Sequence, residues 1–130
     1  LLARPRIAVL ANTPVSSDRY GHLWHHLDTV LGVPFTILDA TSFRRPDLRR
    51  YNVLILPPGA GSIVSDHTKT LETWVRAGGT LVACGSTAAS FTAERAGLSA
   101  VVLRRHALEE LESYAAVAAR ERRGNFVEHG

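Results

Sequence analysis

Cys84 is the only cysteine of the chain, and it stands at the end of a short apolar run, Thr80-Leu81-Val82-Ala83. Small residues follow it, as a strand requires if it is to turn sharply into a helix. A thiol at such a turn is exposed, and the N-terminus of the next helix favours its thiolate form. Cys84 is therefore a candidate nucleophile, although a free cysteine at this place also serves as a small apolar core residue.

A thiol nucleophile needs a general base, and the oxyanion it creates needs hydrogen-bond donors. His106 is the candidate base, because it follows the next expected strand and could reach the same edge of a sheet. Five residues in two small-residue turns are the candidate oxyanion or ligand-binding residues: Gly59, Ala60, Gly61, Gly85 and Ser86. No acidic partner of His106 is identifiable, so the sequence favours a core cysteine over a catalytic one.

Two further groups suggest binding rather than catalysis. Residues 57–62 contain two glycines before a helix and could bind an anion, but their spacing is not that of a P-loop or a dinucleotide fingerprint. His22, His25 and His26 share one exposed helix face, whereas a zinc site needs three or four defined ligands. The sequence places no Asp, Glu or Cys beside them, so we predict no metal site and no cofactor in this domain.

The composition excludes several classes of protein. The 130 residues suffice for one domain with a single core, and 45% hydrophobic with 21% charged residues is typical of a soluble globular chain. No apolar run approaches the ~20 residues of a membrane span, and no signal peptide is visible. The net charge of +3 comes from small arginine groups without interleaved aromatic residues, so we expect no nucleic-acid partner. The chain starts at Leu1 and contains no Met, so we expect a domain excised from a longer chain, of unknown compartment.

Apolar runs and helical periodicity alternate along residues 1–130. We predict strands at residues 6–11, 33–38, 51–56, 80–84 and 100–103. We predict helices at residues 18–31, from 65 or 66 to 77, from 88 to 96, and at 107–122; residues 41–50 have room for a short helical turn. Non-alternating apolar strands between helices indicate a flavodoxin-like, doubly wound α/β domain with a mainly parallel five-stranded sheet and helices on both faces.

Three stretches together resemble the class I glutamine amidotransferase-like superfamily: residues 53–59, 74–83 and 84–86. In that superfamily a Pro-Gly loop supplies the oxyanion hole. A helix that ends in Gly-Gly leads into a strand, and a cysteine stands at the turn after this strand. Here Ser86 replaces the usual glycine two residues after the nucleophile, and Gly85 stands one residue early. No histidine lies directly beside Cys84, while His106 matches in order the histidine that some hydrolase-like branches place after the next strand.

A narrower resemblance runs through residues 20–28 and 31–36. They are similar to the amidotransferase-like domain that follows the catalytic domain in some bacterial zinc carboxypeptidases of the carboxypeptidase A type. In that domain the nucleophile is commonly lost, and no catalysis is known.

This resemblance implies a non-catalytic accessory domain of a larger zinc metallocarboxypeptidase. Zinc and the peptidase site would lie outside residues 1–130, the parent could be secreted, and the partners would be its other domains, with a homodimer as a further candidate and no membrane partner. Two alternatives stay open: a small thiol hydrolase with Cys84 as nucleophile and His106 as base, and an anion- or sugar-binding module at the same sheet edge.

Overall fold

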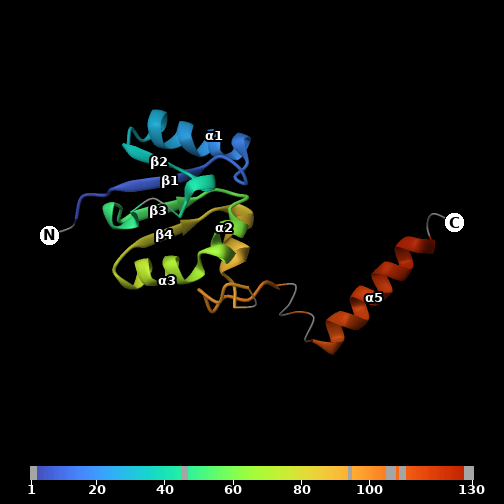
Figure 1. Ribbon diagram of the computed structural model, residues 1–130. Coiled ribbons are helices and arrows are strands. Elements are labelled where there is room, and N and C mark those ends of the chain that lie inside the picture. Colours follow the sequence, from blue (N-terminus) through green and yellow to red (C-terminus); the bar gives the residue numbers. More distant parts are fainter. Residues whose placement is uncertain (1–2, 45–46, 94, 105–107, 109–110, 128–130) are drawn as a thin grey trace.

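Four parallel strands form the centre of the molecule (Figure 1). The computed structural model describes residues 3–44, 47–93, 95–104, 108 and 111–127. The strands lie in the order β2-β1-β3-β4, and their bounds are β1 (Ile7–Ala11), β2 (Phe35–Asp39), β3 (Val53–Leu56) and β4 (Thr80–Ala83). The predicted α/β class with a parallel sheet is confirmed, since all three strand pairs run parallel.

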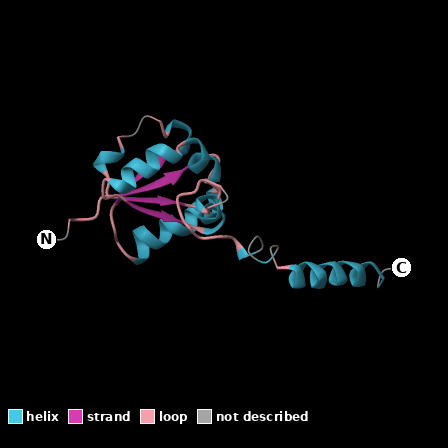
Figure 2. Cartoon of the chain, turned by 90° about the horizontal axis from the view of Figure 1, so that it is seen from below, coloured by secondary structure: helices cyan, strands magenta, loops and turns pink. Residues whose placement is uncertain are grey.

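Strands β1 and β3 are buried on both faces because their apolar residues do not alternate with polar ones, whereas the edge strands β2 and β4 are partly exposed. Val9, on one face of β1, packs with Leu27 and Ile55, while Leu10 on the other face belongs to a larger cluster that includes Leu54. Successive strand side chains point to opposite faces, so one apolar run supplies both clusters. Figure 2 shows helices on both sides of the sheet.

One face is covered by α1 (Ser17–His25), which continues directly into a π-helical turn (His26–Val30). The chain leaves this helix through Gly32, at φ 59°, as predicted for a glycine after a helix end. Leu27 is buried, whereas Trp24 and Val30, which α-helical spacing would place on the same face, are exposed. A π-turn changes the number of residues per turn, so the stripe of an ideal α-helix does not persist through it.

The opposite face is covered by two short helices, α2 (Gly61–Asp66) and α3 (Thr68–Arg76), rather than by one helix beginning at residue 65 or 66. Two 3-10 turns (Ala40–Ser42 and Leu48–Arg50) fill the connection between β2 and β3, where the sequence left room for one turn. The indole Nε1 of Trp74 donates to the Leu48 carbonyl at 2.9 Å, which ties α3 to the second turn.

The segment after β4 differs most from the prediction. A 3-10 helix (Gly85–Phe91) replaces the helix predicted from residue 88, and residues 101–103 have no regular structure where a fifth strand was predicted. The backbone of this segment pairs with itself, since Ala93 N–H donates to the Val101 carbonyl at 3.2 Å and Ser99 N–H to the Phe91 carbonyl at 2.9 Å. The sheet therefore has four strands within the described residues.

The last helix, α5 (Glu112–Val127), begins and ends later than the predicted 107–122 and extends away from the body of the molecule (Figures 1 and 2). Its apolar side chain Val117 is exposed, as is Leu111 just before it. Among the described residues, no helix is both long and apolar enough to cross a membrane.

Candidate functional site

The carboxyl ends of β3 and β4 bring together two loops, residues 57–61 and 84–87, which carry the predicted ligand-binding residues. Ligands of open α/β sheets bind at this edge. Gly59 N–H donates to the Ser86 hydroxyl at 3.3 Å, and Ala60 N–H donates to the Thr87 hydroxyl at 3.0 Å. The structure therefore places Gly59, Ala60, Gly61, Gly85 and Ser86 in one region.

Thr87, which no sequence motif singles out, is the central residue of this contact. It is fully buried, and its hydroxyl accepts from Ala60 N–H and donates to the Pro57 carbonyl at 2.6 Å. Ser86 and Thr87 are adjacent hydroxyl residues, and no spacing in the sequence distinguishes them. Only the direction of the 3-10 helix decides that Thr87 points into the protein and Ser86 toward solvent.

These hydroxyls occupy two of the candidate oxyanion donors, the N–H groups of Gly59 and Ala60. An oxyanion hole directs its N–H groups at the place where charge develops, free of other partners. In this arrangement the N–H groups of Gly59 and Ala60 instead hold the two loops together. Gly61 is also packed, because a Cβ there would lie 2.6 Å from the Ser90 hydroxyl.

Cys84 continues strand β4 rather than occupying the sharp turn. Its backbone is extended, at φ −107° and ψ 140°, and its N–H donates to the Leu56 carbonyl at 2.9 Å. The left-handed position is one residue later, at Gly85, with φ 56°. A nucleophile elbow holds the reactive side chain at the strained turn itself; here that position has no side chain.

The Cys84 thiol is half-buried and packs against the cluster of Val9, Leu27 and Ile55 on the α1 face of the sheet. This is the environment of a small apolar residue. His106, the predicted base, lies outside the described residues, so no distance relates it to the thiol.

The crevice between β1 and β3, where the chain connections diverge, is closed by direct backbone contact. Ser16 N–H donates to the Pro58 carbonyl at 3.3 Å, and a Cβ on Gly59 would lie 2.8 Å from the Pro14 carbonyl oxygen. Gly59 has φ 99°, so only a glycine fits both this conformation and this approach. The crevice that binds ligands in doubly wound folds is therefore filled by the protein's own loops.

Tyr20 is a second residue that no sequence pattern marks as special. Its hydroxyl is buried and has no hydrogen-bond partner among the described residues. Burial raises the pKa of Tyr20, because the phenolate would lose its hydration. The ring contacts both core clusters, so Tyr20 serves packing at the start of α1.

The helix face that carries His22, His25 and His26 is exposed. His22 Nε2 lies 3.9 Å from Asp18 Oδ1, with both side chains in solvent, and such exposed pairs contribute little. Within the part of the chain that the structure describes, no three His, Cys, Asp or Glu side chains gather as metal ligands.

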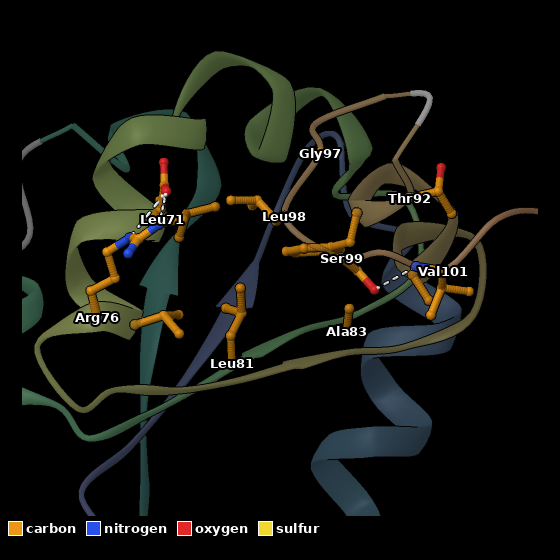
Figure 3. A pocket seen from close by; sticks show the side chains of 13 residues that line it. Leu71, Arg76, Leu81, Ala83, Thr92, Gly97, Leu98, Ser99 and Val101 are labelled. Carbon is orange, nitrogen blue, oxygen red and sulfur yellow. Dashed lines mark hydrogen bonds and ion pairs between the residues drawn. The ribbon is translucent and has the colours of Figure 1, made fainter.

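A cavity of about 640 Å³ lies on the other face of β4, between α3 and residues 88–101 (Figure 3). Leu81 and Ala83 of β4 form its floor, and Leu71, Leu98 and Val101 contribute apolar walls. Cys84 does not line it. The sequence could not indicate this cavity, because its walls come from three separate segments whose meeting depends on the tertiary fold.

Comparison with known proteins identifies no relative: no family model matches the chain, and no curated protein and no solved structure matches it.

Proposed function

We propose that this chain is a non-catalytic accessory domain of the class I glutamine amidotransferase-like type, belonging to a larger zinc metallocarboxypeptidase. The proposal rests on the resemblance of residues 53–59, 74–86, 20–28 and 31–36. The strand order β2-β1-β3-β4 is compatible with it, since it equals the first four positions of a flavodoxin-like sheet. The fifth position, beside β4, is not filled within the described residues.

One observation carries the non-catalytic part of the proposal: Cys84 lies in extended backbone, and the turn position belongs to Gly85. Two hydrogen bonds support the same conclusion, because the N–H groups of Gly59 and Ala60 already donate to the hydroxyls of Ser86 and Thr87. We infer that this edge of the sheet serves packing between loops.

Zinc enters the proposal only through the parent chain. The described residues offer no group of three ligands, so they do not fit a zinc site. The peptidase metal would be bound by another part of a longer protein, and this domain would act by packing against that part or by orienting its substrate.

Alkylation of Cys84 tests the proposal, because a single cysteine gives one unambiguous signal. The rate of iodoacetamide labelling is measured between pH 5 and 10, on the folded chain and on the chain in urea, with N-acetylcysteine as reference. We expect the folded chain to be labelled more slowly than the chain in urea at each pH, because the thiol is half-buried in the folded protein. Rapid labelling below pH 7 would instead support the thiol hydrolase that uses Cys84.

A further inference from the structure

Strand β4 has one paired and one free edge. Thr80 N–H donates to the Asn52 carbonyl at 2.8 Å and Cys84 N–H to the Leu56 carbonyl at 2.9 Å. In parallel strands alternate residues direct both backbone groups to the same neighbour, so Thr80, Val82 and Cys84 face β3. Leu81 and Ala83 therefore direct their N–H and carbonyl groups away from the sheet. Nothing in the described part of the chain pairs with them as a further strand.

This edge is short, at four residues, but it has no charged residue, proline or bulge to prevent strand pairing. Natural edges carry charged residues, proline or bulges, whereas β4 reads Thr-Leu-Val-Ala and is regular. Val82 is 40% exposed on one face of the strand, and the apolar cavity adjoins Leu81 and Ala83 on the other. Both faces thus present apolar surface next to unpaired backbone groups, so the edge is suited to pairing with another strand.

We propose that a second copy of this chain covers it, through antiparallel pairing of the two β4 strands about a two-fold axis at Val82. In this register Leu81 of each copy lies opposite Ala83 of the other copy. Both are residues whose backbone groups point outward, and each such pair exchanges two hydrogen bonds. The outward N–H and carbonyl groups of Leu81 and Ala83 are then all hydrogen-bonded. The same surface of each copy forms the interface, as a two-fold axis requires.

The same register brings the two Val82 side chains together at the axis. Residues directly opposite in a non-hydrogen-bonded antiparallel pair have Cα atoms about 4.5 Å apart. The exposed apolar side chain of Val82 would therefore be covered by its own counterpart. The pairing would also cover Val75 of α3, which is exposed beside the cavity floor.

Charge does not oppose this approach. The charged side chains beside the cavity are Glu72 and Arg76, which pair with each other at 2.9 Å. Charged side chains on an edge strand commonly oppose edge-to-edge association. Here two identical edges can meet without bringing unpaired charges of the same sign together.

Residues 100–103 of the same chain are the rival occupant, since they are apolar and follow β4. The backbone of Val101 is already engaged, however, because its N–H donates to the Ser99 hydroxyl at 3.2 Å and its carbonyl accepts from Ala93 N–H. Pairing with β4 would require these hydrogen bonds to break. A second copy needs no such rearrangement.

Disulfide trapping tests the proposed register. In a Cys84→Ala background, Val82→Cys is expected to give a disulfide-linked dimer as the main product of mild oxidation, since a Cα separation of about 4.5 Å lies within the disulfide range. Thr80→Cys in the same background is the matched control, because it shares the strand and the face. Its symmetry-related copy would lie roughly 13 Å away at the rise of a strand, so it should remain monomeric.

The result is decisive in both directions. Failure of Val82→Cys to cross-link while the chain stays folded overturns the proposal, and so does equal cross-linking of both variants, which would indicate random collision. Sedimentation velocity gives a measurement without thiols: the unmodified chain and Val102→Lys should sediment as dimers, and Val82→Lys as a monomer. A monomeric unmodified chain would overturn the proposal, leaving the assignment of Cys84 untouched.

Discussion

The buried Thr87 hydroxyl joins the two loops at the carboxyl edge of the sheet, and its partners are both backbone groups. It accepts from Ala60 N–H and donates to the Pro57 carbonyl. Two polar backbone groups therefore depend on one side chain in a place without solvent. The Thr87 hydroxyl therefore links residues 57–61 to residues 84–87 by hydrogen bonds.

Replacing Thr87 by Val tests this interpretation. Val has the same shape but no hydroxyl, so Ala60 N–H and the Pro57 carbonyl would be left without a partner. We expect the free energy of unfolding, measured by urea denaturation, to fall by about 1–3 kcal/mol. Thr87→Ser is the control, because it keeps the hydroxyl and loses one methyl group, at a cost of about 0.8 kcal/mol. Equal losses for both variants would contradict the role of the hydrogen bonds.

Gly85 is the second residue on which the turn depends. It adopts φ 56°, and a Cβ there would lie 2.9 Å from Pro58 Cγ. We expect Gly85→Ala to lower the free energy of unfolding by about 1–2 kcal/mol, the cost of left-handed backbone for a residue with a side chain.

Gly21 provides the contrasting substitution, since it lies within α1 and a Cβ added to it would meet no atom within 4 Å. Gly21→Ala should raise the free energy of unfolding by roughly 0.5–1 kcal/mol, because alanine favours helix interiors. If Gly85→Ala is as stable as the unmodified chain, the turn is not the fixed feature that we describe.

At the scale of elements, the 3-10 turn after β2 begins with a capping carboxylate. Asp39 accepts from the N–H of Thr41 at 2.8 Å and from its hydroxyl at 2.7 Å. These hydrogen bonds, the hydroxyl first, hold the pKa of Asp39 below its ordinary value, with a further contribution from Asn12. The turn that follows buries Ala40 and leads to Phe43, so the cap fixes the start of the crossover.

A lowered pKa in the folded state makes the cap's contribution depend on pH. The contribution is fully present above the ordinary aspartate pKa of about 3.9 and is lost as the pH falls through the lower pKa of the folded protein. We expect Thr41→Val to weaken the pH dependence of the thermal midpoint below pH 4. Thr36→Val, an exposed threonine on β2, is the control and should leave the profile unchanged; a similar change in both would sink this assignment.

The element that sequence periodicity described worst is the segment after β4. Val101, Val102 and Leu103 have the composition of a strand, yet they stay irregular because Ser99 and Ala93 take the hydrogen bonds of Val101. Composition alone reports that residues suit a sheet, whereas pairing depends on which backbone groups are free. The parallel strands β1 and β3 were predictable because their continuous apolar runs demand burial on both faces.

At the scale of the whole molecule, α5 stands apart from the α/β body (Figures 1 and 2). Among the described residues, the core clusters are built from the body, without a contribution from α5. An isolated helix of this length gains little stability by itself in water. The body should therefore fold without it.

Truncation after Leu103 tests this division. We expect the thermal midpoint and the cooperativity of unfolding, followed by the near-ultraviolet signal of Trp74 and Trp24, to match those of the full chain. The full chain measured at the same concentration is the control. A lower midpoint or a broadened transition would show that the removed segment packs on the body.

Local sequence patterns were sufficient to predict the parallel α/β class, the four strands β1 to β4, and the position of Cys84 at the carboxyl end of β4. Those features follow from local apolar runs and glycine breaks, which any burial-driven fold must respect. Tertiary structure alone decided that the turn residue is Gly85, that Ser86 and Thr87 occupy the donors of Gly59 and Ala60, and that β4 keeps a free edge within the described chain. Each of these depends on which distant backbone groups meet, and hydrogen-bond partners across a fold are not written in local spacing.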